Sequence, residues 1–347
     1  MPAEVVTGMT AVERHAWDAY GRVRTGVLRM KGAGATGIAA PSDYWNDELS
    51  NIDYMADATP LIIRRLRQHA FWITGLRAYE YRTQSDERNA LFESRLRALL
   101  ELGGADLAVP EPEALGGFGY PIDGGLYNLD TLKFFEVLVG MRRSGILDPL
   151  SRASRPVVVE IGGGWGGLAY QIKTLIPDAT YVIVDLPEVF LFSAVYLGAL
   201  FPEARHVFAT GTDATPAGAD FVYVSNTNVD AIRTLSPDVM VNVASFQEMT
   251  TAQVDAYGSA GASARCPALY SLNRERSRHN TELTGITDVL TRYYDLRQVD
   301  VLDTDYTQAM KKPSKARRPK TGGAPEDPLR YRHLAGRVRG AGPVPVS

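Results

Sequence analysis

The sequence feature that most constrains the fold is residues 157–167, which read Val-Val-Val-Glu-Ile followed by Gly-Gly-Gly-Trp-Gly-Gly. Three consecutive β-branched valines and Ile161 predict a strand that is buried on both faces, as in a parallel sheet. Five glycines then crowd the turn, and the apolar residues at positions 168, 172, 175 and 176 have the spacing of a helix packed on a sheet. The segment therefore predicts a strand, a tight turn and a helix.

The glycine-rich turn points to a nucleotide-like cofactor. Glycine permits positive φ and leaves no Cβ in the way of a ligand, while the amino terminus of the following helix offers unpaired N–H groups. A P-loop would need Gly-Lys-Ser or Gly-Lys-Thr, and no lysine directly follows these glycines. The G-x-G-x-x-G spacing of dinucleotide folds is satisfied at Gly162, Gly164 and Gly167, so spacing alone leaves a nicotinamide cofactor open.

Glu160 separates the two cofactor classes. A carboxylate two residues before the first glycine would repel an anionic pyrophosphate, but it suits the cationic sulfonium and ammonium of S-adenosylmethionine. Asp185 ends a second apolar strand and is placed to accept both ribose hydroxyls, a feature that the two classes share. The alternative role for Asp185 is a helix N-cap, because Pro187 and Glu188 then open a helix. The sequence therefore favours S-adenosylmethionine as the cofactor.

The adenine is expected beside the residues that follow the third strand of the sheet. These are Asn226 and Thr227 if that strand is residues 221–224, with Asp213 as the rival if it is residues 206–209. The residues expected to bind the cofactor are Glu160, Gly162, Gly163, Gly164, Gly166, Asp185, Leu186, Asn226 and Thr227.

Composition places the chain among ordinary soluble proteins. Its 347 residues, 45% hydrophobic and 22% charged, are enough for two domains or one large domain with an extension. A formal net charge of −3 gives no reason to expect a nucleic-acid or membrane partner. The single Cys266 rules out an intrachain disulfide and a cysteine-based metal cluster. The amino terminus lacks the pattern of a signal peptide or a membrane helix, so we expect a cytoplasmic protein.

Three regions are expected along the chain. Residues 1–150 are predicted to form a helical cap that binds the acceptor and offers a surface for homo-oligomer formation. Residues 151–310 alternate strands with helices, which predicts an α/β fold with a doubly wound, Rossmann-like parallel sheet that binds S-adenosylmethionine. Residues 311–347 combine a basic loop with a segment near 329–334 that is typical of a last strand. Within these regions we expect helices at 10–30, 85–102, 128–146, 188–200 and 281–294, an irregular loop at 107–125, and a strand at 296–302. Residues 42–81 are expected to form a helical region, with a helix start at Thr59-Pro60 and a stop at Gly75.

Several blocks of the sequence together resemble the sugar O-methyltransferases, a family of class I S-adenosylmethionine-dependent enzymes associated with bacterial natural-product and glycan clusters. The blocks are residues 51–55, 66–69, 73–75, 116–119, 128–132, 160–167, 182–188, 242–249, 271–274 and 280–283. The resemblance covers about residues 42–337 and departs from the family at the basic insertion near 311–328. It implies a bacterial methyltransferase, of the kind found in antibiotic biosynthesis, that methylates a sugar hydroxyl of a glycosylated natural product or an activated sugar.

Methyl transfer to a hydroxyl requires a group that removes a proton while the acceptor oxygen lines up with the C–S bond. Glu248 follows the fourth predicted strand, at the edge where such sheets bind ligands, and is the first candidate for the base. Its alternatives are a helix cap or an ion pair with arginine. His69 is the second candidate, because a neutral imidazole accepts a proton near pH 7, and its alternative is packing on a helix.

The acceptor is expected to be a small sugar or glycoside. The residues expected to bind it are Gln247, Asn273, Arg274, Glu282 and Tyr120. Asn273, Arg274 and Glu282 would serve equally as a set of interdomain ion pairs, and aromatic residues such as Tyr120 are also typical of a core. Carboxylates at strand ends can bind Mg²⁺ through oxygen, but no spacing requires a metal, so none is assigned.

Two other functions stay open at this point. One is a nicotinamide-dependent oxidoreductase, which Glu160 and the lack of an evident hydride-transfer pair disfavour. The other is a non-catalytic scaffold that binds the cofactor and recruits a partner through its cap. The glycines with Glu160 and Asp185 argue against the scaffold.

Overall fold

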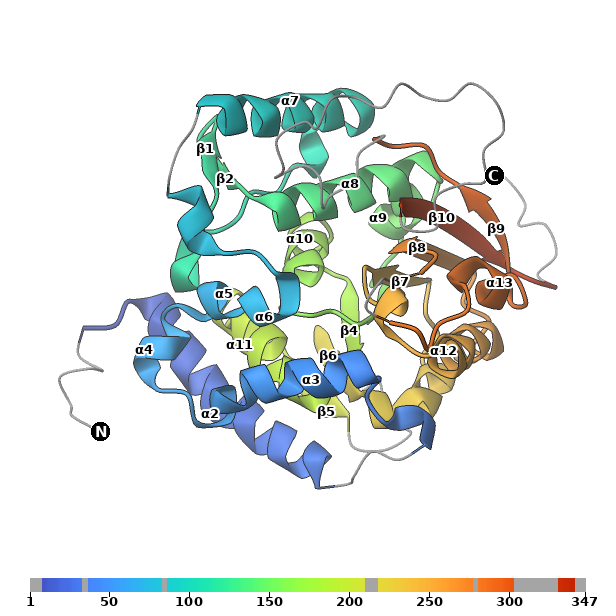
Figure 1. Ribbon diagram of the computed structural model, residues 1–347, viewed down its shortest axis with the longest axis horizontal. Helices are drawn as coiled ribbons and strands as arrows, with labels where there is room; N and C mark the ends of the chain where they lie inside the picture. The colour runs from blue at the N-terminus through green and yellow to red at the C-terminus, as the bar shows by residue number, and fades with distance from the viewer. Residues whose placement is uncertain are drawn as a thin grey trace.

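The computed structural model describes residues 8–32, 37–82, 86–209, 218–276, 280–302 and 330–340. Within them, eight strands form one sheet in the order β5-β6-β4-β3-β7-β8-β10-β9, with helices on both faces (Figure 1). The strands are β3 (Val157–Ile161), β4 (Thr180–Asp185), β5 (His206–Ala209), β6 (Phe221–Ser225), β7 (Val239–Val243), β8 (Ala268–Arg274), β9 (Tyr294–Gln298) and β10 (Tyr331–Val338). This confirms the predicted α/β, Rossmann-like fold.

The pairing of the strands differs from a wholly parallel sheet in one place. The pairs from β5 to β8 are all parallel, whereas β10 runs antiparallel to both β8 and β9. β6 lies next to β4, and β5 adds an edge strand beyond it. Asn226 therefore follows the strand that neighbours β4, while Asp213 and the basic segment near residues 311–320 lie outside the described residues.

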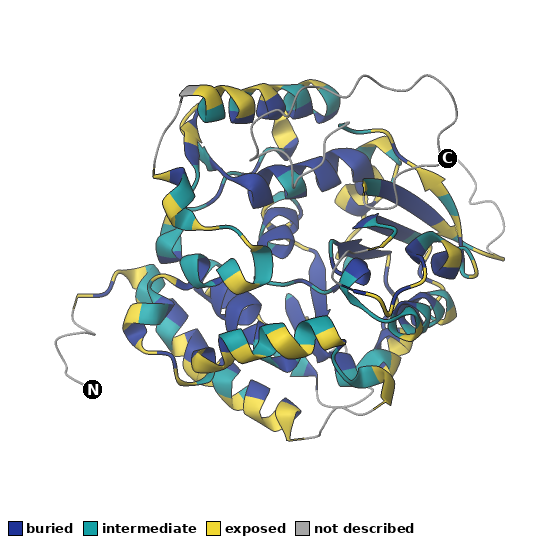
Figure 2. Ribbon diagram, in the orientation of Figure 1, coloured by how far each residue is buried: buried dark blue, intermediate teal, exposed yellow. Residues whose placement is uncertain are grey.

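Each face of the sheet buries its own apolar core, because side chains alternate along a strand. Val158 and Tyr181 face one core, and Val159, Ile161 and Val182 face the other. Helices α10 (Gly167–Leu175) and α11 (Phe190–Leu200) cover the first core, and α12 (Thr251–Ser263) and α13 (Ile286–Leu290) cover the second. Figure 2 shows the strands of the sheet as mostly buried and the outer helices as exposed on one side.

The helices before the sheet are α2 (Ala11–Lys31), α3 (Asp43–Ile52), α4 (Pro60–Ile63), α5 (Leu66–His69), α6 (Phe71–Thr74), α7 (Asp86–Gly103), α8 (Leu129–Arg143) and α9 (Leu147–Arg152). The helical region expected over residues 42–81 consists of several short helices. Pro60 starts α4, and Gly75 ends α6 with φ +71°, so the predicted start and stop signals lie where expected. The region expected to be an irregular loop also holds a hairpin, β1 (Tyr120–Ile122) and β2 (Gly125–Tyr127).

The helix expected over residues 281–294 is shorter than its pattern suggested. Asn280 Nδ2 donates to the carbonyl oxygens of Gln247 and Met249, and the Thr251 amide donates to the Glu282 carbonyl. These bonds hold residues 280–284 against the start of α12, so the helix begins only at Ile286. β9 consequently starts at Tyr294, earlier than the strand expected at 296–302.

Part of the region preceding residue 150 packs directly on the sheet. α8 lies over β8 and β10, where Tyr270 Oη approaches Gly140 so closely that a Cβ there would lie 1.7 Å from it. α2 packs on α11, and one apolar core runs continuously from Ala16 to Ala335. α3 and α6, by contrast, lie over the carboxyl ends of the strands (Figure 1). The separate cap at 1–150 stays a prediction.

None of the described helices combines the length and the apolar character that crossing a membrane requires.

Candidate functional site

A pocket lies at the carboxyl ends of the parallel strands, where ligands bind in sheets of this kind. Its cavity volume is about 190 Å³. Strand ends and their loops supply one wall, namely Glu160, Gly162, Gly163, Gly164, Trp165, Val184, Asp185, Leu186, Asn226, Val229, Val243, Ala244, Ser245, Gln247, Glu248 and Met249. Helices and β10 supply the rest, namely Ile38, Pro41, Ser42, Trp45, Ile73, Thr74, Lys133, Phe134, Gln253, Ala256, Tyr257 and Tyr331.

The glycine turn after β3 has a shape that only glycine allows. Gly162, Gly164 and Gly166 have φ values of +73°, +56° and +88°, which strain any residue with a Cβ. At Gly162 a Cβ would also lie 2.0 Å from Ser245 Oγ. Gly166 is the N-cap of α10 and lies outside the pocket lining, so it shapes the turn while Gly162, Gly163 and Gly164 face the pocket.

Asp185 fixes this turn to the end of β4. Its Oδ2 accepts a hydrogen bond from the Gly164 amide at 2.9 Å, and its Oδ1 accepts one from the Leu186 amide at 2.8 Å. Burial raises the pKa of Asp185 to about 7, although these amides favour the ionised form. The N-cap of the following 3₁₀ helix is Leu186, so the structure does not give Asp185 that role.

Glu160 is a buried carboxylate directly beneath the turn. Tyr181 Oη donates a hydrogen bond to its Oε2 at 2.9 Å, and the same oxygen lies 3.0 Å from where a Cβ of Gly163 would stand. Burial raises the pKa of Glu160 to about 8, and the negative charge of Asp185 adds to this. A cation in the pocket would relieve both effects, because it favours the ionised carboxylate.

Glu248 faces the same pocket from the loop after β7. The Trp45 indole donates a hydrogen bond to its carboxylate, and its carbonyl oxygen accepts one from Ser42 Oγ at 2.7 Å. Burial raises the pKa of Glu248 to about 8. The cap of α12 is Thr250, which forms a capping box with Gln253, so Glu248 is free of the capping role considered for it.

The remaining residues expected at the cofactor or acceptor divide into two groups. Leu186, Asn226 and Gln247 line the pocket. Asn226 also donates from Nδ2 to the Ala39 carbonyl at 2.7 Å, which ties the loop before α3 to the end of β6. Thr227 lies outside the lining, and its hydroxyl pairs with Ser225 Oγ at 2.8 Å.

Five of the expected site residues stand behind the pocket or away from it. His69 Nδ1 pairs with Tyr54 Oη at 2.7 Å, and Tyr120 is fully buried against Tyr81 and Phe92. Asn273 bonds to Asn242 and to the Gln247 amide, and the Arg274 amide donates to Gln247 Oε1, so both position Gln247. Glu282 Oε2 accepts from the Asp43 amide at the start of α3. None of the five lines the pocket, because local packing or hydrogen bonding holds each elsewhere.

Sequence patterns alone missed several pocket residues, chiefly Lys133, Thr74, Ser245 and Tyr331. Lys133 directly follows the block at 128–132, and its place in the second turn of α8 after the Asn128 cap was a usable signal. The other three come from a loop, a short helix and β10, whose approach to the strand ends depends on tertiary packing.

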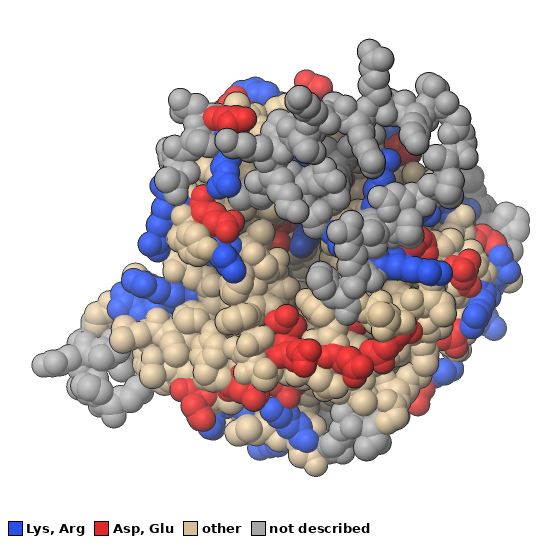
Figure 3. All heavy atoms as spheres, viewed as in Figure 1, with Lys and Arg blue, Asp and Glu red and all other residues tan. Residues whose placement is uncertain are grey.

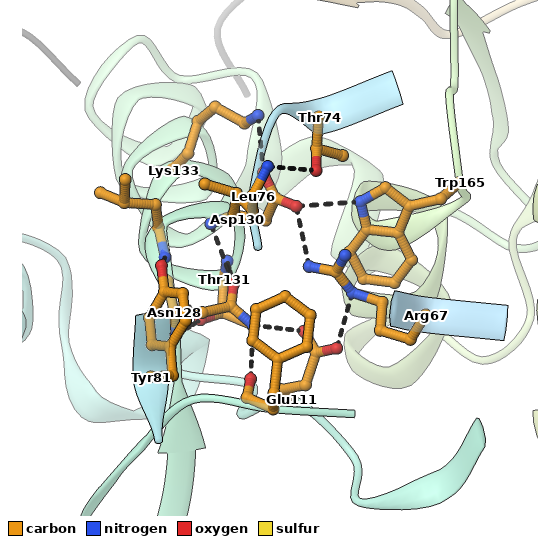
Figure 4. A network of polar contacts seen from close by, with 12 residues as sticks. Arg67, Thr74, Leu76, Tyr81, Glu111, Asn128, Asp130, Thr131, Lys133 and Trp165 are labelled. Carbon is orange, nitrogen blue, oxygen red and sulfur yellow. Dashed lines mark hydrogen bonds and ion pairs between the residues drawn. The ribbon is translucent and has the colours of Figure 1, made fainter. Parts of the chain in front are cut away.

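A buried polar network joins the helices before the sheet to the glycine turn (Figure 4). Arg67 of α5 donates to Glu111 Oε1 at 2.7 Å and to Asp130 Oδ2 at 2.8 Å, and its guanidinium stacks on the Trp165 ring at 3.8 Å. Trp165 Nε1 donates to the same Asp130 oxygen at 3.2 Å, and Lys133 Nζ donates to Asp130 Oδ1 at 3.1 Å. Trp165 and Lys133 both line the pocket, so the network supports its wall from behind.

Acidic side chains also border the pocket on the outside. Figure 3 shows a band of Asp and Glu across the face over which α3 lies. α3 carries Asp43, Asp47 and Glu48, and residues at its start, Ser42 and Trp45, line the pocket.

No group of three or more His, Cys, Asp or Glu side chains suited to a metal ion occurs within the part of the chain that the structure describes.

No protein-family model matches the sequence, and no curated protein matches it. Solved structures that it resembles include human N-acetylserotonin methyltransferase in complex with SAM, with 12% identity, a TM-score of 0.32, and coverage of 85% of this chain and 68% of that one. The CurJ carbon methyltransferase has 12% identity, a TM-score of 0.34, and coverage of 97% and 93%. Precorrin-6y C5,15-methyltransferase from Geobacter metallireducens has 13% identity, a TM-score of 0.32, and coverage of 56% and 87%. Likeness at this level carries no argument about activity or acceptor.

Proposed function

We propose that this protein is a class I methyltransferase that transfers the methyl group of S-adenosylmethionine to a hydroxyl of a small sugar or glycoside. The observation that supports this most is a set of three carboxylates, Glu160, Asp185 and Glu248, around one pocket behind a glycine turn. Burial raises the pKa of each, and the lining sets these three carboxyls against one lysine, so their ionised forms are short of positive charge. A cationic nucleoside supplies that charge.

The residues present fit S-adenosylmethionine. When bound, it supplies a methyl group made electrophilic by the sulfonium. Glu160 would hold its ammonium, and Asp185 would hold the ribose hydroxyls with the acceptor capacity left after the two backbone amides. Leu186, Asn226 and Val229 follow on β4 and β6 and would border the adenine.

A dinucleotide fits the same turn less well. Its pyrophosphate would lie on the amides of Gly162–Gly164 with the buried Glu160 carboxylate directly beneath, and like charges in such a site repel strongly. Glu160 would then have to stay protonated. The raised pKa of Glu160 permits that at neutral pH, but a protonated Glu160 gives a dinucleotide no ionic contact, whereas an ammonium or sulfonium pairs with the ionised carboxylate, so a nicotinamide cofactor fits the pocket less well.

Glu248 is the proposed general base, which takes the proton from the hydroxyl group that is methylated. A base works best when its pKa lies near the working pH, and the pKa of Glu248 is raised to about 8 by burial. Trp45 holds the carboxylate in place, and its ring offers an apolar surface for a sugar face. Gln247 and Tyr331, joined at 3.1 Å, line the same part of the pocket and can bind hydroxyl groups. His69 is not carried forward as a base, because it lies outside this lining.

The cofactor is tested by calorimetric titration of the purified protein with S-adenosylhomocysteine and with NAD. We expect binding of the thioether nucleoside with one site per chain and no binding of NAD. Asp185→Ala should remove the thioether binding, whereas Asp230→Ala, which removes an exposed carboxylate, should leave it unchanged. Binding of NAD in place of S-adenosylhomocysteine would overturn the proposed function in favour of an oxidoreductase.

The role of Glu248 is tested with Glu248→Gln. Loss of a general base lowers the rate by roughly 100- to 10,000-fold, so kcat should fall by that factor with S-adenosylhomocysteine affinity nearly unchanged. Sugars and glycosides are screened with wild-type protein by mass spectrometry for a product heavier by one methylene. In wild type, kcat should rise with pH through about 8 as Glu248 ionises. A variant that keeps wild-type kcat would exclude Glu248 as the base.

A further inference from the structure

Lys133 has no role in the function proposed so far, although it lies in the wall of the pocket. Among the described residues that line the cavity, it is the one lysine, and no arginine is among them. It lies in the second turn of α8, and its side chain is 18% exposed. A pocket with three carboxylates thus contains one fixed cation.

The side chain of Lys133 is held in place by contacts that use one of its hydrogen-bond donors. Nζ donates to Asp130 Oδ1 at 3.1 Å and lies 5.0 Å from the centre of the Phe134 ring. Asp130 is itself fixed through its other oxygen by Arg67 and Trp165 (Figure 4). An ammonium has three N–H donors, and Asp130 is the one hydrogen-bond acceptor that the described residues give it. The remaining donors are available to a ligand.

The position of Lys133 relative to the carboxylates matches one chemical group. Lys133 lines the same pocket as Glu160 and Glu248, and its positive charge lowers the pKa of both carboxyls. Asp185, Leu186 and Asn226 belong to the neighbouring strands β4 and β6 and would take the nucleoside part. An α-amino acid carries an ammonium and a carboxylate on the same carbon. A buried carboxylate with an ammonium near it, at the β3 side of the pocket, is complementary to such a zwitterion.

We propose that Lys133 binds the carboxylate of the methionine part of the cofactor, while Glu160 binds its ammonium. Lys133 thereby selects nucleosides that carry an intact amino acid. This inference rests on the proposed function. It assigns to Asp130, and through it to Arg67 and Trp165, the task of positioning the lysine. A different role, in which Lys133 only balances the charge of Asp130, would give the protein no preference for the carboxylate.

The test compares S-adenosylmethionine with its decarboxylated form, which keeps the sulfonium, the ammonium and the nucleoside. Affinities are measured by calorimetry for wild type, Lys133→Met and Lys133→Arg, and folding of each is checked by circular dichroism. Loss of a charged hydrogen bond reduces affinity roughly 10- to 150-fold. Wild type should therefore favour S-adenosylmethionine by that factor. Lys133→Met should bind the two forms nearly equally, and Lys133→Arg should keep most of the preference.

The outcomes separate this inference from the function on which it rests. If wild type binds neither form, the proposed function fails. If wild type binds both but Lys133→Met keeps the preference, or loses affinity for both forms equally, the assignment of Lys133 fails and the cofactor stands. If Lys133→Met does not fold, wild type and Lys133→Arg provide the test. Equal binding of the two forms by wild type overturns the assignment, and a preference for S-adenosylmethionine that persists in Lys133→Arg supports it.

Discussion

Replacing Glu160 by glutamine is expected to weaken S-adenosylhomocysteine binding by roughly 30- to 4,000-fold. Truncating one partner of a buried, hydrogen-bonded charge pair costs about 2–5 kcal/mol, and Glu160 is buried and accepts a hydrogen bond from Tyr181. Glutamine keeps the shape of the side chain, so the loss reports the charge facing the ligand ammonium. Calorimetric titration at constant pH and salt measures it.

The same carboxylate predicts how binding depends on pH. Because burial raises the pKa of Glu160 to about 8, the free protein holds a proton there at neutral pH, and a bound cation drives that proton off. Affinity should therefore rise with pH up to about 8 and then level off. Titrations in buffers of different ionisation enthalpy would show the proton that is released.

Stability of the unliganded protein should move in the opposite direction. The pKa of Glu160 is raised from its ordinary value of 4.5, so between pH 4.5 and about 8 the folded state binds more protons than the unfolded state. The contribution of Glu160 to the free energy of unfolding is therefore fully present below pH 4.5 and decreases as the pH rises from 4.5 to about 8. Glu160→Gln should remove that fall. Glu93→Gln is the control, because Glu93 is exposed and pairs with Arg97 on the surface of the protein.

Unchanged affinity of Glu160→Gln for S-adenosylhomocysteine would contradict the charge argument for the cofactor.

The sheet and the glycine turn were predictable because their signals are local. The valines before Glu160, the glycines after it and the apolar run that ends at Asp185 specify strands and a turn whatever else the chain does. Parallel strands then bring their carboxyl ends to one edge, so Glu160, Asp185 and Glu248 come together without further information.

The rest of the pocket depends on contacts between distant segments. Trp45 reaches Glu248 because Ser42, at the start of the same helix, bonds to the Glu248 carbonyl across 206 positions of sequence. Nothing near Trp45 in the sequence indicates this. Asn273 and Arg274 lie at the carboxyl end of β8, but their hydrogen bonds go to Gln247, so they lie behind the residue that faces the pocket. His69 is directed away by Tyr54.

The stability of the pocket wall depends on Arg67. It is fully buried between the Trp165 and Phe118 rings, and it pairs with two carboxylates that are themselves buried, Glu111 and Asp130. Removing one partner of a buried ion pair destabilises the folded state strongly, because the remaining charge stays buried without compensation. Replacing the whole pair by apolar residues costs much less. This single side chain thus ties α5, the loop at Glu111, α8 and the glycine turn to one another.

Arg67→Met is therefore expected to lower the free energy of unfolding by about 3–5 kcal/mol, measured by urea denaturation. Arg97→Met should cost at most about 0.5 kcal/mol, because its pair with Glu93 is an exposed i,i+4 contact. The triple variant Arg67→Met, Glu111→Gln, Asp130→Asn should recover part of the loss, since no uncompensated charge then remains. If Arg67→Met costs no more than Arg97→Met, the network does not hold the wall together. A variant that folds should bind S-adenosylhomocysteine less tightly, because Trp165 and Lys133 lose the Asp130 geometry that Arg67 fixes.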